Sequence, residues 1–226
     1  IDSLSEWQDL INPKGSRYIK FAISCKESAA LSSKGLHLKS LSTSTGFVSG
    51  YDGIIYLKDS SRLPLKPEKL EKKRKREERL FKILKNPVTE RQLSGKWRIV
   101  FHPDVFQDLL FSVFLNNFRG SLVDKGSSKF EVDDFRKSMQ AFRPDISLTA
   151  NPTENGKMDS YNFTREGVTS RKTTFIKDGK LITPILDLKY ARKLNMEPTA
   201  KINRYMDATK IESKNSASYD SFLAEQ

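Results

Sequence analysis

The stretch LLFSVFLNNFRGSLVDKGSSKF, residues 109–130, decides how the fold of this 226-residue chain is interpreted. Its first half repeats apolar residues at helical spacing, which predicts an amphipathic helix with one broad buried face. A polar turn and a pair of serines are expected to follow Arg119-Gly120. The pattern alone is typical of a core helix in a soluble domain. The residues expected on the buried face are Leu109, Leu110, Val113, Phe114 and Leu115.

The sequence on either side of this helix predicts further strands and helices, and therefore an α+β fold. The dipeptide Asp178-Gly179 predicts a tight hairpin, because both residues readily adopt positive φ angles. From Lys201 onward the composition becomes polar and the periodicity fades. The elements expected around the helix are strands at Trp97–His102 and Phe142–Thr149, a hairpin of Lys172–Lys177 with Lys180–Leu186, and a short helix at Asp187–Leu194.

The first third of the chain also predicts β-structure. Tyr18–Cys25 alternates like a strand, with Cys25 expected as a small buried residue at its end. Ser28–Thr45 is rich in Ser, Leu and Lys, and we expect irregular strands or an exposed loop there. Gly46–Leu57 predicts a hairpin, because an Asp-Gly pair lies between two apolar runs.

A basic helix is predicted at Pro67–Asn86. Lys66–Lys85 holds ten Lys or Arg and four Glu. Its net charge is therefore 10 − 4 = +6, which is half of the chain's net charge of +12. In three pairs a Glu precedes a Lys by four residues, which favours a solvated, salt-bridged helix face. The pairs are Glu68–Lys72, Glu71–Lys75 and Glu78–Lys82. The alternative is a surface that grips a phosphate backbone, although no aromatic residues that could stack on bases interleave with the charges. The candidate basic surface comprises Lys72, Lys73, Arg74, Lys75 and Arg76.

The composition limits the compartment and the class of protein. Cys25 is the single cysteine, so no disulfide can form within the chain, and a reducing cytoplasmic setting is predicted. No apolar run approaches the roughly 18 residues of a membrane helix, so no membrane association is expected. The chain begins at Ile1 rather than Met, and the sequence leaves open whether an N-terminal segment is missing.

Local motifs point to no active site. The sequence contains no glycine-rich phosphate loop and no Gly-x-Ser-x-Gly nucleophile elbow. His37 and His102 are the only histidines, and each is expected to be an ordinary residue rather than a metal ligand. Asp133-Asp134 and Asp145 could bind a cation, but acidic clusters of this kind are usually solvated.

Three ordered stretches resemble the C-terminal domain of the TldD/PmbA family, also called modulators of DNA gyrase or peptidase family U62. The most specific stretch has Thr-x-Glu-Gly at residues 164–167, an Ile-x-x-Gly hairpin at 176–179, Ala-Arg-x-Leu at 191–194, and Thr199. The chain continues past Thr199 for fewer residues than family members usually do. The three stretches are SGKWRIVFHPDVFQDLLF (94–111), FRGSLVDKGSSKF (118–130) and YNFTREGVTSRKTTFIKDGKLITPILDLKYARKLNMEPT (161–199).

The family has two branches, which differ on the helix quoted above. TldD-like subunits carry His-Glu-x-x-x-His there, with two zinc-binding histidines and a glutamate base, and PmbA-like (TldE) subunits lack it. Aligned without gaps, the histidines fall on Phe111 and Asn116 and the glutamate on Ser112. A phenylalanine ring offers zinc no lone pair, and a serine is a poor base at its ordinary pKa. The resemblance therefore implies a PmbA/TldE-like subunit without catalytic residues or cofactor of its own.

The resemblance also sets out what we expect of the whole protein. Residues 1–66 are expected to form a partial N-terminal α+β domain, 67–94 a linking basic helix, and 95–226 a shortened β-rich C-terminal domain. The expected partners are a TldD-like zinc-bearing subunit or further copies of the chain, with peptides or unfolded polypeptides as substrates, in peptide maturation or proteolysis. One alternative is a nucleic-acid or acidic-protein binder using Lys66–Lys85. Another is an independent hydrolase built around Ser112 or Cys25.

Overall fold

The computed structural model describes residues 18–51, 54–63, 66–68, 70–72, 74–75, 78, 95–96, 99, 101, 103–203 and 205–214. The chain divides into two units, one of Ile1–Ser28 with Ser40–Val100 and the other of Ala29–Lys39 with Phe101–Gln226. The three-part division expected from the sequence stays a prediction. No helix among the described residues has both the length and the apolar character that a membrane crossing requires.

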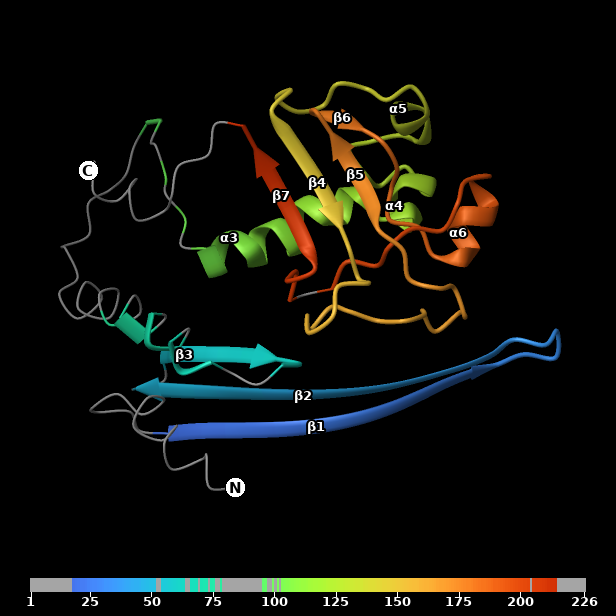
Figure 1. The fold of residues 1–226 in the computed structure, drawn as a ribbon. Helices are drawn as coiled ribbons and strands as arrows, with labels where there is room; N and C mark the ends of the chain where they lie inside the picture. Colours follow the sequence, from blue (N-terminus) through green and yellow to red (C-terminus); the bar gives the residue numbers. More distant parts are fainter. Residues whose placement is uncertain are drawn as a thin grey trace. The chain divides into compact units, whose positions relative to one another are not determined.

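Three antiparallel strands in the order β1-β2-β3 form the first sheet (Figure 1). They are β1 (Tyr18–Leu31), β2 (His37–Tyr51) and β3 (Ile54–Ser61). The predicted hairpin is confirmed, because β2 and β3 pair from Thr45 opposite Ser61 to Tyr51 opposite Ile54. Its two turn residues, at 52–53, lie outside the described part of the chain.

The structure decides between the two alternatives for Ser28–Thr45 and contradicts the prediction for Cys25. Ser28–Thr45 is mostly strand, since β1 continues to Leu31 and β2 begins at His37. Most of the described β1 side chains are exposed, so the strand needs no apolar face, and residues 28–31 at its end lack the alternation that marks a half-buried strand. For the same reason Cys25 is exposed rather than buried.

The predicted basic helix is confirmed where the structure describes it. Residues 67–68, 70–72, 74–75 and 78 are helical, and Leu70 of the expected apolar stripe is buried. Glu71 and Lys75 form the expected pair, with 3.6 Å between Oε1 and Nζ. The remainder of Pro67–Asn86 lies outside the described residues.

The second sheet has four antiparallel strands in the order β6-β5-β4-β7. The predicted hairpin through Asp178-Gly179 is confirmed, with φ angles of 47° and 77° at these two residues. β4 starts later than predicted because the chain turns before it, with the Ile146 N–H donating to the Arg143 carbonyl. The strands are β4 (Ile146–Ala150), β5 (Thr173–Lys177), β6 (Lys180–Leu181) and β7 (Thr209–Ser213).

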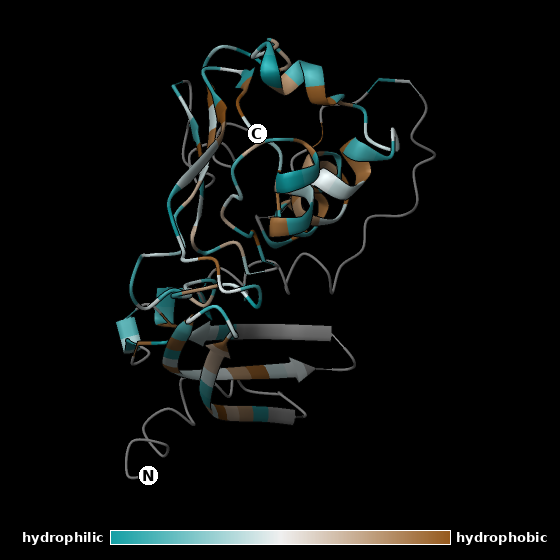
Figure 2. Ribbon diagram, turned by 90° about the vertical axis from the view of Figure 1, so that its right-hand side faces the viewer, coloured by the Kyte–Doolittle hydropathy of each residue, from teal (hydrophilic) through white to brown (hydrophobic). Residues whose placement is uncertain are grey.

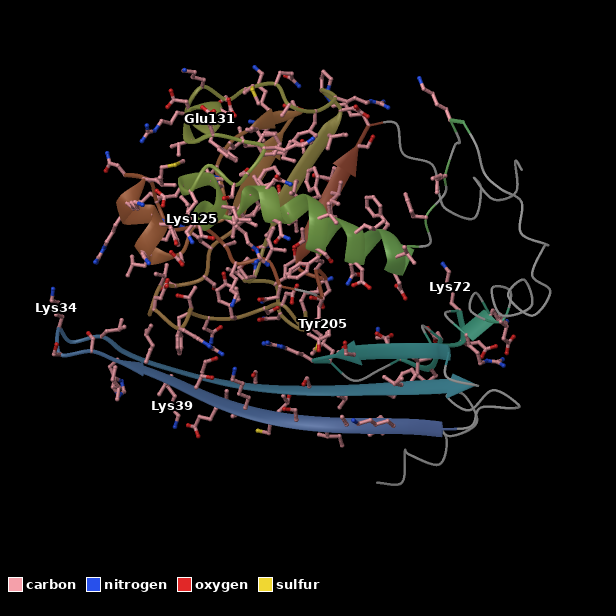
Figure 3. All side chains as sticks on the ribbon, turned by 180° about the vertical axis from the view of Figure 1, so that it is seen from behind. Lys34, Lys39, Lys72, Lys125, Glu131 and Tyr205 are labelled. Atoms are coloured by element: carbon pink, nitrogen blue, oxygen red, sulfur yellow. The ribbon has the colours of Figure 1, made fainter. Side chains whose placement is uncertain are left out.

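A helical run crosses one face of this sheet, behind it in Figure 1 and in front of it in Figure 3. It was predicted as one helix from Leu109, but it is three successive pieces of different pitch. Two shorter helices follow, and α6 confirms the predicted helix after Asp187. The elements are α3 (Pro103–Leu109), the π-turn η1 (Leu110–Phe114), the 3-10 turn η2 (Leu115–Phe118), α4 (Gly120–Asp124), α5 (Val132–Arg136) and α6 (Leu188–Lys193).

The core of the second unit lies between these helices and the sheet. Phe118 is fully buried at its centre, with Leu148 of β4 and Phe175 of β5 in the same cluster. The predicted buried face is partly wrong, because Leu109 and Val113 are exposed while Phe111 and Phe118 face the core. Figure 2 shows apolar and polar residues mixed along the helices of this unit. A strand at Trp97–His102 is not found at Ile99 or Phe101, and its other residues lie outside the described part of the chain.

Candidate functional site

The π-turn η1 is the unusual feature of the helix on which the resemblance places the zinc motif of TldD-like subunits. The Leu115 N–H donates to the Leu110 carbonyl, which is the i→i+5 bond of a π-turn. In a regular α-helix, positions five apart point about 140° away from each other around the axis. A wider turn brings such positions closer to one face, and π-turns occur frequently at functional sites. Positions 111 and 116 are five apart and span this turn.

The three side chains at the motif positions are occupied by contacts within the helix and the core. Phe111 is partly buried against the core cluster. The Ser112 hydroxyl donates to the Asp108 carbonyl, and the Asn116 amide nitrogen donates to the Ser112 carbonyl. The Asn116 Oδ1 atom is buried and accepts no hydrogen bond from the described residues. That orphaned amide oxygen could contact a metal only as a weak ligand.

These residues do not fit a zinc ion. Zinc in proteins takes Cys, His, Asp or Glu ligands, usually four including water, and these positions offer one weak amide oxygen. Within the described ranges, no group of three or more His, Cys, Asp and Glu side chains could hold a metal ion. His37 is exposed at the start of β2, and His102 lies outside the described residues.

The serine-containing stretch after the helix fixes the end of η2. Ser128 Oγ donates to the Asn117 carbonyl at 2.7 Å, and the Lys129 N–H donates to Asn117 Oδ1 at 2.9 Å. The Gly120 N–H donates to the Ile185 carbonyl at 2.9 Å, which joins α4 to the segment before α6. This stretch therefore positions the helix that bears Phe111, Ser112 and Asn116.

Residues of the most specific family stretch, 161–199, hold distant parts of the second unit together. Glu166 accepts a hydrogen bond at 2.9 Å from the Leu188 N–H, so it caps α6 from 22 residues away, beside Asp187, the local cap. Gly167 follows with a φ of +77°, which favours glycine. Thr199 Oγ1 accepts from the Leu186 N–H at 2.8 Å. The sequence pattern gave no sign of these roles, because each joins segments far apart in the chain.

The candidate basic surface is only partly available as positive charge. Arg74 donates to Glu71 at 3.0 and 2.9 Å and to Glu78 at 2.7 Å, so its guanidinium faces two carboxylates of its own helix. These Arg74 hydrogen bonds are the main reason that the pKa of Glu71 is lowered. Lys72 and Lys75 are exposed (Lys72 is labelled in Figure 3). Lys73 and Arg76 lie outside the described residues.

The acidic residues singled out in the sequence have local partners. Asp133 pairs with Lys137 at 3.2 Å, and Asp134 completes a capping box at the start of α5. Asp145 accepts hydrogen bonds from Arg143 and from Ser213 of β7. These contacts explain the three carboxylates as structural residues, in line with the plainer interpretation of acidic clusters.

Comparison with known proteins agrees with this fold. Residues 94–224, more than half of the chain, match the sequence model of the PmbA/TldA metallopeptidase C-terminal domain. No curated protein is similar enough to count as a match. Three solved structures share the fold at 17–20% sequence identity, and the chain covers just under half the length of each, 46–48%.

Two of these structures are of proteins described as proposed modulators of DNA gyrase, and the third is of TldE. The modulator from Thermotoga maritima has 20% identity and a TM-score of 0.65, with 85% of this chain and 46% of that one covered. TldE from Thermococcus kodakarensis has 17% identity and a TM-score of 0.65, with 91% of this chain and 48% of that one covered. The protein from Bacteroides thetaiotaomicron has 18% identity and a TM-score of 0.62, with 88% of this chain and 47% of that one covered. The matched domain, which covers the helix, the hairpin and α6, shows that this chain belongs to the PmbA/TldD family.

Proposed function

We propose that this chain is a PmbA/TldE-like subunit that binds no catalytic metal and works beside a zinc-bearing, TldD-like partner. The proposal depends on Phe111, Ser112 and Asn116, which are poor zinc ligands at the positions that align with the family's zinc motif. These positions span the π-turn η1. The turn supplies a backbone on which residues five apart approach one face. The side chains supply no ligand set for zinc.

The proposed complex acts on peptides or unfolded polypeptides, in peptide maturation or degradation. In that division of labour, the partner's histidines hold zinc and its glutamate acts as general base. This chain contributes a wall of the substrate chamber and contacts with the partner. Its own motif positions serve packing, because Phe111 contacts the core and the polar groups of Ser112 and Asn116 bond to the helix backbone.

Metal analysis of the purified chain tests the proposal. After incubation with excess zinc and removal of the unbound ion, we expect far less than one zinc per chain. A matched variant, Phe111→His with Ser112→Glu and Asn116→His, places the family's ligands on the same turn and should retain more zinc. Stoichiometric, tight zinc binding by the unaltered chain would overturn the proposal.

A further inference from the structure

The solvent side of α6 carries a cluster of exposed cations. Arg192 and Lys193 follow Lys189 by three and four residues, so the three side chains project from one side of the helix. Ala191 and Leu194, on the other side, are buried in a small apolar cluster of their own. The apolar side therefore holds α6 on the domain, and the three cations form the face that it presents to solvent.

The end of α4 adds a fourth cation beside this helix. Lys193 Nζ lies 2.6 Å from Asp124 Oδ2, which joins the end of α6 to the end of α4. Lys125 directly follows Asp124, and its side chain is exposed (Lys125 is labelled in Figure 3). We refer to Lys125, Lys189, Arg192 and Lys193 together as the α6 basic surface.

Little negative charge offsets the α6 basic surface. Asp124 is the one carboxylate among the described residues that pairs with it, and Lys193 holds that carboxylate. Residues 188–196 contain no Asp or Glu. The helix dipole accounts for Arg192 and Lys193, which lie in the last turn, where a cation is favourable. It does not account for Lys189, which lies in the first turn, where the dipole disfavours a cation.

The chemistry of this surface limits what can cover it. A second copy that met it with the same surface would bring like charges together, which is costly when they lose water. A nucleic acid would bring phosphates, but the Tyr190 ring of α6 is half-buried and has Lys189 Nζ 5.4 Å from its centroid, so that face is not open to stack on a base. Tyr190 and Met196 instead border the cations with partly exposed apolar atoms, which a protein surface can contact.

We propose that the α6 basic surface binds an acidic surface of the TldD-like partner, on which Asp or Glu side chains surround apolar residues. The inference rests on the proposed function for the existence of that partner, and it adds where the partner binds and with what chemistry. The Lys193–Asp124 pair fixes the spacing between Lys125 on α4 and the cations on α6. A fixed pattern of charge selects an acidic partner and favours one orientation of it.

The test uses the full chain co-expressed with a TldD-like chain from the same organism that carries His-Glu-x-x-x-His. The affinity of the purified pair is compared for the unaltered chain and for Lys189→Glu with Arg192→Gln. This double variant should weaken binding by about tenfold or more, because it removes two cations and adds a charge that repels an acidic partner. Lys125→Gln, on the other element, should weaken binding in the same direction. Binding of the unaltered pair should also weaken as salt rises from about 0.05 M to about 0.5 M, and the double variant should flatten that dependence.

Lys177→Glu with Lys180→Gln is the matched control. These two exposed lysines face each other across the β5–β6 hairpin, outside the α6 basic surface, and their replacement changes the net charge by the same amount. The control should keep the affinity of the unaltered chain within about twofold, since it leaves the proposed contact intact. Thermal melting of all variants shows whether each one folds.

The outcomes separate this inference from the proposed function. If the pair forms and the α6 variants bind like the hairpin control, the docking surface is wrong while the proposed function stands. A labelled DNA duplex is the second probe. If the α6 double variant loses affinity for the duplex and keeps its affinity for the TldD-like chain, the surface binds nucleic acid and the inference is overturned. If the unaltered chain does not bind the TldD-like chain at all, both proposals fail.

Discussion

Gly120, the first residue of α4, is a position where one added methyl group would matter. A Cβ atom there would lie 2.4 Å from Leu186 Cδ2 and 3.2 Å from the Ile185 carbonyl oxygen. We expect Gly120→Ala to lower the free energy of unfolding by about 1–3 kcal/mol, because overpacking shifts neighbouring atoms from their places. Denaturant titration measures the change. In open space the same substitution stabilises a helix by up to about 1 kcal/mol, so a more stable variant would contradict the close contact.

Single residues also show how far sequence could locate the candidate site. Phe111, Ser112 and Asn116 were found by placing a family motif on the chain, and their failure as zinc ligands follows from their chemistry. Their contacts could not be predicted, because the π-turn that contains them depends on packing against the sheet. The buried Asn116 Oδ1 atom is visible only in three dimensions.

Asp145 gives a pH-dependent prediction that links two strands. Its carboxylate accepts from Ser213 of β7 at 2.7 Å and from Arg143 at 3.1 Å, and the Ser213 hydrogen bond is the main reason that its pKa lies below the usual 3.8. A carboxylate whose pKa is lowered by folding stabilises the fold above its unfolded pKa, and this contribution is lost as the pH falls through the folded value.

Asp145→Asn should therefore melt at a lower temperature than the unaltered chain at pH 7. The gap should close as the pH falls from about 3.8 through the lower pKa of the folded chain, where the carboxylate becomes protonated. Melting curves across acidic and neutral pH measure this. Glu197→Gln, at an exposed carboxylate, is the control and should follow the unaltered chain. A gap that stays constant with pH would rule out the proposed linkage.

Phe118 and Val113 lie five residues apart on the helical run but differ in burial. Phe118 is fully buried, with ring centroids 5.4 Å from Phe114 and 5.8 Å from Phe135, whereas Val113 is 62% exposed. Phe118→Ala should cost about 3–5 kcal/mol of unfolding free energy, as truncation of a buried phenylalanine usually does. Val113→Ala should change it by about 0.5 kcal/mol or less. Denaturant titrations of both variants measure the contrast, and similar losses would mean that the π-turn is misplaced.

Elements held by local chemistry were predictable, and elements held by distant contacts were not. The β5–β6 hairpin followed from Asp178-Gly179, and α6 was expected at Asp187–Leu194, where the structure shows Asp187 as its N-cap. β7 was missed because its sequence, TKIES, is polar and its only strand partner among the described residues is β4. The division of the helical run into α3, η1 and η2 was missed for a related reason, since apolar spacing does not reveal the pitch of a turn.

At the scale of the whole molecule, the chain spans just under half the length of the solved structures that share its fold. The substrate chamber that we propose therefore needs surfaces beyond the residues of this chain. The family motif positions and the exposed residues Val105, Leu109 and Val113 lie on the same helical run.

Peptide hydrolysis by the assembled pair tests this division of roles. Replacing the glutamate of the partner's zinc motif by Gln should lower the rate by about 100-fold or more, as expected for loss of a general base. Ser112→Ala and Asn116→Ala in this chain should each leave the rate within about twofold, since neither side chain is assigned a chemical role. A chelator should abolish the activity of the pair. Hydrolysis by this chain alone after chelator treatment, lost in Ser112→Ala, would show instead that it is an independent hydrolase.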